Sequence, residues 1–520
     1  MIPVNDITII IPITSAFSMK VKPPLFSISN NLDSLLAAFL GFILIQIFTK
    51  HSGIGISPDS VSYLSTSRHL LAGRGLLSFD NYPLVDFPVA YPFILTIISF
   101  FTQSDPLQYA PILNGLLFGL LIYLSGVILN GFDKPSPWYK RVILLCILMS
   151  PALQEVYSLL WSETVFLSLI LLFILAISNY IQEASLKWLL ISSTLCSVVC
   201  ITRYAGIFLI LTGLILIFFN REIKWQKRII HCLFFGSLSF SLLAINIFRN
   251  HLMAGLFMGA RPKSDIGIWK NMEYFGGVLC DWLLLDRKPV LAHVITMIVW
   301  LIFTTVIVVT RFYKKTKYTK EYVIAVTGLV YCLFMIFTSS LTLYEQFTNR
   351  LLSPVFIPII CCLSFWIPGL IAKSYYRFRW AWLLAVLIMA SVFLKIQLAA
   401  DYEYYDGVKD AGIPGYREDP FLQSDIVQFV EKYKSQFDPR FLIYSNAGEA
   451  VYSITGLAAR QLPFAVFLPK VQEYYAMEKT YLVWFTDLDN PEMPDLNTIL
   501  KNRNMVLIKQ LKDGAVYVNR

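Results

Sequence analysis

The sequence has 520 residues, of which 56% are hydrophobic and only 15% are charged, and its mean hydropathy is +0.61. Soluble domains usually carry about 25% charged residues, so these values exclude a soluble globular protein and predict a chain that lies mostly in a membrane. The net charge of +9 comes from Lys and Arg in short gaps between apolar runs, which favours a role in membrane topology over a nucleic-acid partner.

The first 31 residues are predicted to form a cytoplasmic or interfacial lead. Their apolar run, Ile7 to Phe17, is too short to cross a bilayer, and Lys20 and Lys22 follow it, whereas a signal peptide has its basic residues first. Eleven longer apolar runs come next. We predict that each spans the membrane, at residues 33–49, 108–131, 142–157, 164–181, 188–202, 205–219, 229–248, 290–310, 322–338, 351–370 and 380–397.

Lys and Arg gather in alternate gaps between these runs. Sixteen of them lie in the gaps at 132–141, 182–187, 220–228, 311–321 and 371–379. The positive-inside rule places these gaps in the cytoplasm, so the N-terminus is cytoplasmic and the C-terminus is external. Segments 50–107 and 249–289 become long external loops, and residues 91–103 are predicted as an interfacial helix. We expect a multi-pass protein of a bacterial inner or plasma membrane.

Residues 32–398 are therefore predicted as a mainly α-helical transmembrane bundle, and residues 399–520 as a small external α/β domain. In the latter, charges and prolines become more frequent, and helix-like and strand-like segments alternate. The predicted helices are Ser424 to Tyr433, capped by Ser424, and Ala447 to Ile454. The predicted strands are Phe441 to Tyr444, Tyr481 to Phe485, Met505 to Leu511 and Ala515 to Val518.

The eight cysteines show no metal-binding or disulfide pattern. Seven lie in apolar runs, Cys280 stands alone in a loop, and none falls within residues 399–520. We predict packing roles for them, and nothing in the sequence assigns a metal or another cofactor.

Two acidic residues stand at predicted helix starts on the external side. Asp59 follows Ser57 and Pro58, a pair that favours the cap and first turn of a helix, and Glu163 precedes the run at 164–181. Either carboxylate could take the proton from an acceptor hydroxyl during sugar transfer. The alternative is that each only complements the dipole of its helix.

Three arginines, Arg203, Arg249 and Arg350, lie at the external ends of predicted spans, where the positive-inside rule disfavours them. One interpretation is that they bind the phosphate of a lipid-linked sugar, which gains charge as the sugar leaves. The alternative is that they reach the headgroups of the outer leaflet, as basic side chains at helix ends often do.

Several motifs in this order resemble the large membrane glycosyltransferases of the GT-C fold. This group includes protein O-mannosyltransferases, the aminoarabinose transferases of lipid A and the RgtA/B/C/D-like bacterial enzymes. The resemblance covers about residues 33–370. Its motifs are Pro58-Asp59-Ser60-Val61-Ser62-Tyr63-Leu64, Ala72-Gly73-Arg74-Gly75-Leu76, Phe87-Pro88-Val89-Ala90-Tyr91-Pro92 (similar to a "PPLYP" stretch), Ser162-Glu163, Thr202-Arg203-Tyr204 and Asn349-Arg350-Leu351-Leu352-Ser353-Pro354.

The resemblance implies transfer of a sugar from a polyprenyl-phosphate donor to a lipid, glycan or protein acceptor at the non-cytoplasmic face, with inversion. It implies Asp59 as the catalytic acid or base, and we expect Glu163 to assist it. The residues expected to contact substrate are Tyr63, Arg68, Tyr91, Arg203, Arg249 and Arg350. The sequence departs from many relatives, which carry two adjacent acids where Asp59 stands alone.

Two other classes of function stay open at this point. A transporter or flippase for a lipid-linked glycan would depend on polar groups near the membrane midplane, of which the sequence shows few. Transporters also often contain inverted repeats, and the sequence shows no such internal symmetry. A structural or assembly protein with an external binding domain would leave the outer-face arginines without a role.

Overall fold

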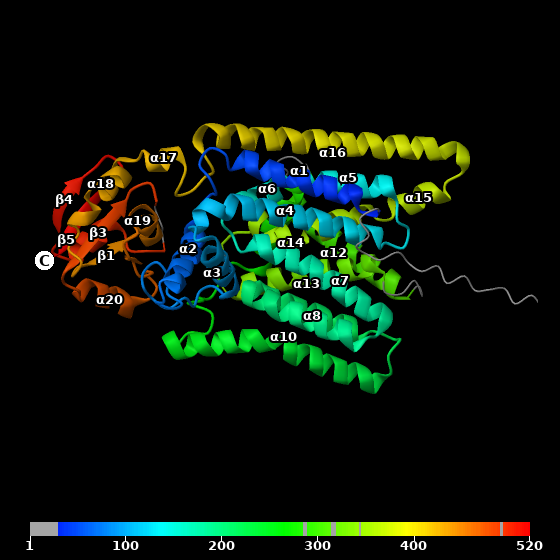
Figure 1. Cartoon of the computed structure of the whole chain (residues 1–520), viewed down its shortest axis with the longest axis horizontal. Helices are drawn as coiled ribbons and strands as arrows, with labels where there is room; N and C mark the ends of the chain where they lie inside the picture. Colours follow the sequence, from blue (N-terminus) through cyan, green and yellow to red (C-terminus); the bar gives the residue numbers. More distant parts are fainter. Residues whose placement is uncertain (1–29, 284–288, 314–318, 343–344, 489–491, 520) are drawn as a thin grey trace, which may run out of the picture.

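A computed structural model describes residues 30–283, 289–313, 319–342, 345–488 and 492–519. The predicted N-terminal lead lies outside these ranges, apart from its last two residues. Long helices run side by side in one bundle, and a smaller domain with a β-sheet lies at one end of it (Figure 1). The apolar runs of the sequence form the bundle, and the more polar C-terminal residues form the domain at its end.

Each of the eleven predicted spans is helical. The corresponding helices are α1 (Leu32–Phe48), α4 (Pro106–Asn130), α5 (Pro137–Leu148) with α6 (Pro151–Ser158), α7 (Glu163–Glu183), α8 (Leu186–Thr202), η2 (Tyr204–Gly206) with α9 (Ile207–Phe218), α10 (Trp225–Ala254), α12 (Val290–Tyr313), α13 (Lys320–Leu341), α14 (Asn349–Ser364) with α15 (Ile367–Lys373), and α16 (Tyr376–Ala411). The protein is therefore a polytopic, mainly α-helical membrane protein.

The helices differ in length. Within the described residues, seven are long and apolar enough to cross a membrane, and the bent pair α5–α6 makes an eighth. The helices of the other three runs, α1, α8 and α9, are apolar but shorter. The last of the predicted membrane helices, α16, continues to Ala411, fourteen residues beyond the predicted end of its span at 397.

The break between α5 and α6 follows from the local sequence. Pro151 has no backbone N–H to continue the hydrogen bonds of α5, but it suits the first position of a new helix. The Ser150 hydroxyl accepts a hydrogen bond from the Leu153 N–H at 3.4 Å and so caps that helix. The two axes meet at 52°.

Three further helices lie in the loops that were predicted to be external. They are α2 (Pro58–Leu71), α3 (Ala90–Thr102) and α11 (Ile268–Trp282). Helix α3 coincides with the segment predicted as an interfacial helix. Figure 1 shows α2 and α3 lying across the ends of the long helices, next to the small domain.

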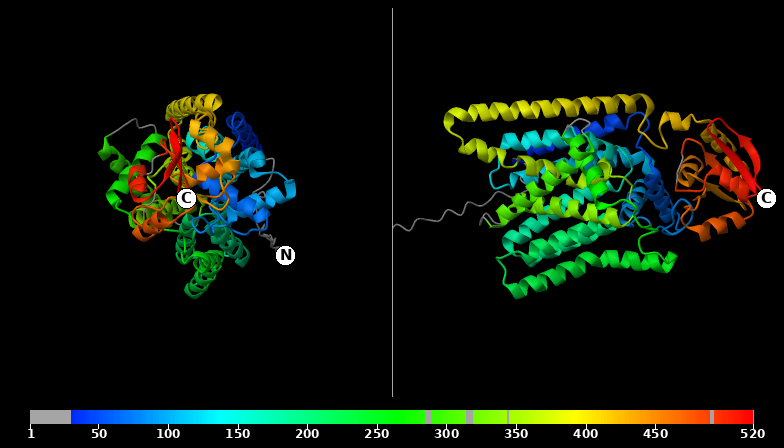
Figure 2. Two further views of the ribbon diagram at one scale, coloured as in Figure 1. Left: turned by 90° about the vertical axis from the view of Figure 1, so that its left-hand side faces the viewer. Right: turned by 180° about the vertical axis from the view of Figure 1, so that it is seen from behind.

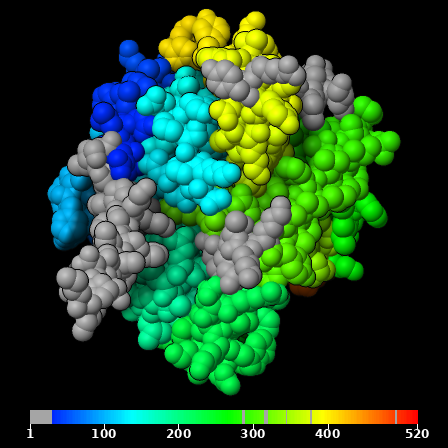
Figure 3. Space-filling model, turned by 90° about the vertical axis from the view of Figure 1, so that its right-hand side faces the viewer, coloured from blue at the N-terminus to red at the C-terminus, as the bar shows by residue number. Residues whose placement is uncertain are grey.

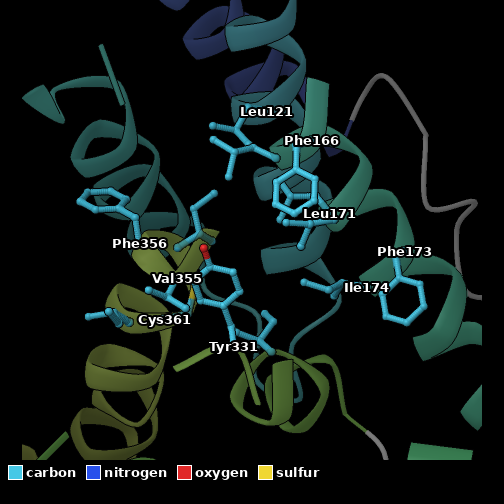
Figure 4. Packing of buried hydrophobic residues seen from close by; sticks show 14 of the residues in the cluster. Leu121, Phe166, Leu171, Phe173, Ile174, Tyr331, Val355, Phe356 and Cys361 are labelled. Atoms are coloured by element: carbon cyan, nitrogen blue, oxygen red, sulfur yellow. The ribbon is translucent and has the colours of Figure 1, made fainter. Parts of the chain in front are cut away.

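The core of the bundle is formed by large apolar side chains from helices far apart in sequence. Leu121 of α4, Phe166 of α7 and Phe356 of α14 are at most 2% exposed and pack together in one cluster (Figure 4). Tyr331 of α13 joins them, and its hydroxyl donates to the Leu351 carbonyl at 2.5 Å. Close packing of this kind holds helices together in a membrane, where lipid competes with side chains for apolar contact.

The C-terminal domain is a mixed five-stranded sheet with helices on both faces. Its elements are α17 (Asp419–Leu422), α18 (Asp425–Tyr433), η3 (Lys434–Gln436), β1 (Leu442–Ser445), α19 (Gly448–Thr455), β2 (Ala459–Gln461), α20 (Leu468–Ala476), β3 (Thr480–Phe485), α21 (Leu496–Asn502), β4 (Val506–Gln510) and β5 (Gly514–Asn519). The strand order is β2-β1-β3-β5-β4. Strand β1 pairs in parallel with β2 and β3, and β5 pairs antiparallel with β3 and β4.

The sequence predicted four of these strands and missed β2. The predicted cap of α18 also differs. Ser424 occupies the cap position, but its side chain makes no capping bond. Instead the Asp513 carboxylate, which precedes β5, accepts hydrogen bonds from the backbone N–H groups of Asp425 (2.9 Å) and Ile426 (3.0 Å). A carboxylate brought there by tertiary folding takes the place of the local hydroxyl.

The apolar core on one face of the sheet continues into the membrane part. On one face, Val483 and Phe485 belong to the same apolar cluster as Val61 and Leu64 of α2. The backbone adds a direct link, because the Tyr416 N–H donates to the Ile56 carbonyl at 2.8 Å. Seen from behind and end-on, the small domain sits against the end of the bundle from which α2 and α3 project (Figure 2).

Candidate active site

Helix α2 presents Asp59 at the junction of the bundle and the small domain. Pro58 starts the helix, and the Ser57 backbone N–H donates to the Ser60 hydroxyl at 3.1 Å, which fixes the first turn. The Ser57 hydroxyl was expected to cap this helix; it also accepts a hydrogen bond from the indole N–H of Trp161 at 2.7 Å. The start of α2 is thereby joined to the segment that precedes α7.

Arg350 joins the two predicted acids. Its Nε donates to Glu163 Oε1 at 2.5 Å, and its Nη2 donates to Asp59 Oδ2. Arg350 is the second residue of α14, Glu163 the first of α7 and Asp59 the second of α2. Three helix starts therefore converge, and two carboxylates share one guanidinium.

Arg203 is the second cation of this cluster. Its Nη1 lies 2.5 Å from Glu163 Oε1 and donates to the Ser162 hydroxyl at 3.1 Å. The Glu163 side chain is only 2% exposed, whereas those of Arg350, Arg203 and Asp59 are 11%, 19% and 24% exposed. A carboxylate buried to this degree needs its cations, because an unpaired charge in a low-dielectric site costs several kcal/mol. Of these two acids, Glu163 is fully enclosed by its partners, whereas the side chain of Asp59 is partly exposed.

Five residues to which sequence reasoning had given no role lie in or beside this cluster. The ring of Trp161 lies 4.4 Å from the Arg350 guanidinium carbon, and Glu345 Oε1 lies 3.8 Å from Arg350 Nη1. Partial burial raises the pKa of Glu345, and the neighbouring Arg350 acts against this shift. Asn349 is held on both sides: its Nδ2 donates to Glu155 (3.2 Å), and its Oδ1 accepts from Trp282 (2.9 Å). Trp161 and Asn349 each stand within two residues of a predicted site residue, which was the available sequence signal.

Tyr63 and Tyr91 lie beneath the cluster. The Tyr63 hydroxyl is 3.1 Å from the Ser162 hydroxyl, and its ring packs edge-on against Tyr91 with centroids 5.0 Å apart. Both side chains are at most 1% exposed. Burial raises the pKa of Tyr63, and the nearby Asp59 carboxylate adds to this shift, so its phenol stays protonated. The pair thus joins α2 to α3 and to the segment that precedes α7.

Arg68 and Arg249 lie outside the cluster. Arg68 Nε donates to Asp105 at 2.8 Å, which joins α2 to the start of α4. Arg249 donates to the carbonyls of Leu84 (2.5 Å) and Leu76 (3.1 Å) and so holds the first loop against α10. Of the predicted site residues, the structure brings together Asp59, Glu163, Arg203 and Arg350, with Tyr63 and Tyr91 below them.

The donor set of this cluster consists of carboxylates already bound to arginines. Across the described ranges, no three His, Cys, Asp or Glu side chains are grouped so that they could hold a metal ion. The exposed carboxylates of the cluster are those of Asp59 and Glu345, whose side chains are 24% and 54% exposed, and Arg203 and Arg350 supply two guanidinium groups for an anion.

No family model matches the sequence, and no curated protein matches it. The fold, however, is similar to that of the aminoarabinose transferase ArnT from Cupriavidus metallidurans in the apo state. The TM-score is 0.56 at 12% identity, over 94% of this chain and 97% of that one. ArnT from the same organism bound to undecaprenyl phosphate aligns over the same shares at 12% identity with a TM-score of 0.48. The chain has the GT-C fold, as its motifs predicted.

Proposed function

We propose that this protein is an inverting membrane glycosyltransferase that moves a sugar from a polyprenyl phosphate to a hydroxyl group of a lipid, glycan or protein acceptor. The observation that carries the proposal is the convergence of Asp59, Glu163, Arg203 and Arg350 from four separate segments at one end of the bundle. The GT-C fold agrees with it. We place the reaction at the non-cytoplasmic face of a bacterial inner or plasma membrane, because the positive-inside rule assigns the gaps that carry sixteen Lys and Arg residues to the cytoplasm.

The proposed reaction is a single displacement. Asp59 takes the proton of the acceptor hydroxyl, and the acceptor oxygen forms a bond to the anomeric carbon. The bond from that carbon to the phosphate oxygen breaks, and its electron pair stays on the polyprenyl phosphate. One bond forms on the face opposite to the one that breaks, so the configuration inverts and no covalent enzyme intermediate arises.

In this reaction the arginines would stabilise the negative charge of the leaving phosphate. The leaving phosphate gains charge as the sugar departs, and fixed cations at that position lower the barrier. Arg350 is 11% exposed and already oriented by Glu163 below and the Trp161 ring beside it. A donor phosphate would replace Asp59 as the third partner of Arg350. That exchange would free the Asp59 carboxylate to act as a base only when donor is bound.

The function is tested with purified protein in lipid nanodiscs, radiolabelled polyprenyl-phosphate sugars, and lipid and glycan acceptors. We expect transfer from at least one polyprenyl-phosphate sugar, with the opposite anomeric configuration in the product by NMR. The Arg350→Lys variant tests the role of the guanidinium group, because it keeps the positive charge but cannot bridge Glu163 and Asp59, and it should lose activity. Transfer from nucleotide sugars instead, or equal activity in Arg350→Lys, would contradict the proposal.

A further inference from the structure

A cavity of about 790 Å³ lies between α8 and α10, far from the candidate active site. Its walls are apolar and come from both helices. The apolar lining residues are Ala184, Leu186, Leu189, Leu190, Ile223, Ile230 and Phe234. Several of these side chains are exposed: Leu186 by 67%, Ile230 by 61% and Leu190 by 50%. A surface of this kind fits a hydrocarbon chain.

The cavity lies at the end of the bundle opposite to the active site. Helix α7 shows this directly, because Glu163 begins it and Ala184, which lines the cavity, directly follows its last residue. Its 21 residues correspond to roughly 30 Å, which is the thickness of the hydrocarbon core of a bilayer. Figure 3 views this end of the molecule, where the start of α8 lies beside the start of α10.

The mouth of the cavity is basic. Lys224, Lys227 and His231 line it together with one acid, Glu222. No ion pair joins Lys224 or Lys227 to any other residue in the part of the chain that the structure describes. His231, by contrast, has a partner, since its Nδ1 lies 2.7 Å from the Tyr180 hydroxyl. Two lysines are therefore available to an anion.

The backbone adds to this charge. Lys224 is the cap residue of α10 and Ser185 that of α8, and neither side chain makes a capping bond. The N-terminal turns of both helices thus present unpaired N–H groups beside the cavity, and helix N-termini attract anions. Apolar walls, two unpaired lysines and two helix starts occur together at the predicted cytoplasmic level of the membrane.

We infer that this cavity binds an anionic phospholipid, with the phosphate at Lys224 and Lys227 and an acyl chain between α8 and α10. Basic pockets between membrane helices on the cytoplasmic side recognise such headgroups, and anionic lipids are the main anions at that depth. The inference does not depend on the proposed sugar transfer, because the site lies at the other end of the bundle.

The test measures lipid retention by native mass spectrometry of the full-length protein. The protein is equilibrated with equal amounts of phosphatidylglycerol and phosphatidylcholine, and the bound lipids are counted. We expect wild type to retain phosphatidylglycerol preferentially. In Lys224→Gln/Lys227→Gln this preference should fall by roughly 25-fold, because each lysine near a lipid phosphate contributes about fivefold in affinity.

Lys187→Gln is the matched control. Lys187 also lies at the start of α8, but its ammonium group stacks at 5.6 Å over the Trp188 ring and does not line the cavity. This variant should keep the preference. Equal retention of the two lipids by wild type, or the same loss in Lys187→Gln as in the double variant, would overturn the inference. The melting temperature of each variant in detergent confirms that the fold persists.

Discussion

At the scale of single residues, Asp59 gives the sharpest test of the proposed reaction. General acid–base groups usually contribute about 10²–10⁴-fold to rate. Asp59→Asn keeps the size of the side chain but removes its basicity, so we expect at least about a 100-fold loss of transfer with donor binding retained. Rate and donor affinity are measured separately. Asp406→Asn, which changes an exposed acid of α16, should transfer at the wild-type rate.

If Asp59 only complements the dipole of α2, Asp59→Asn costs at most about 1 kcal/mol of local stability. Transfer would then continue at a near-normal rate, and the catalytic assignment would be wrong.

Trp161 is a second residue whose role the structure defines. Its ring faces Arg350, and its indole N–H is fixed by Ser57. Cation–π contacts contribute about 0.5–2 kcal/mol, so Trp161→Leu should lower kcat/KM by roughly 2- to 30-fold. We expect most of this loss in KM for the donor, because Arg350 would lose its orientation toward the phosphate. Trp161→Phe should lose less, and Trp138→Leu, at the opposite end of the bundle, should lose nothing. A fall in kcat alone would speak against orientation of a phosphate-binding group.

The sequence singled out individual charged residues as site candidates, but it could not show which of them meet. Glu163, Arg203 and Arg350 stood out because each is a charge at the outer end of an apolar run, and Asp59 because it is an acid in the first turn of a helix predicted in the external loop. Arg249 satisfied the same rule, yet it binds loop carbonyls. Local sequence cannot separate these cases, because Asp59 and Arg350 are 291 positions apart in the sequence and only the packing of α2, α7 and α14 brings them together.

At the scale of elements, the attachment of α16 to the bundle depends on polar contacts. Most of this helix is exposed, but Asp401 is only 6% exposed and accepts a hydrogen bond from Gln154 Nε2 at 3.0 Å. The same Nε2 donates to the Leu148 carbonyl at 3.0 Å, across the break between α5 and α6. Gln154 thus connects three helices.

Gln154→Ala removes both hydrogen bonds and leaves Asp401 without its partner. A buried polar group that loses its partner costs about 1–3 kcal/mol, so the variant should unfold at a lower temperature than wild type. Thermal unfolding in detergent measures this effect. Gln108→Ala, at an exposed position of α4, provides the comparison and should unfold with the wild type. Equal melting of all three proteins would show that α16 is held by other contacts.

The elements themselves were largely predictable, since an apolar run of sufficient length must form a helix in a bilayer. What escaped prediction has local causes. The run at 142–157 contains Pro151, which bends it. Strand β2 has only three residues, too few to show an alternating pattern. Helix α11 lies in a loop of mixed polarity, and its buried face, with Phe275 and Leu279, becomes visible only against α12 and α13.

At the scale of the whole molecule, the predicted orientation can be tested by cysteine labelling. All eight native cysteines are buried or half-buried, so background labelling by a membrane-impermeant reagent should be low. We expect Lys509→Cys, on β4, to react in intact cells and Lys134→Cys, between α4 and α5, to react only after permeabilisation. The reverse pattern would invert the protein in the membrane and place the active site in the cytoplasm.

The unbroken length of α16 has a consequence for the small domain. Its 36 residues extend about 54 Å, whereas the hydrocarbon core of a bilayer is about 30 Å thick. The helix therefore continues well beyond the hydrocarbon core and connects directly to the C-terminal domain. An α-helix turns by about 100° per residue, so one inserted residue rotates the C-terminal domain by about 100° about the helix axis. Seven inserted residues make nearly two full turns, so they restore the orientation of the domain and move it about 10 Å along the axis. An alanine inserted after Ala400 should therefore move α19 out of contact with α2, so that the first loop loses its packing against the C-terminal domain. The angular phase of a single helix thus determines how the C-terminal domain is aligned with the site.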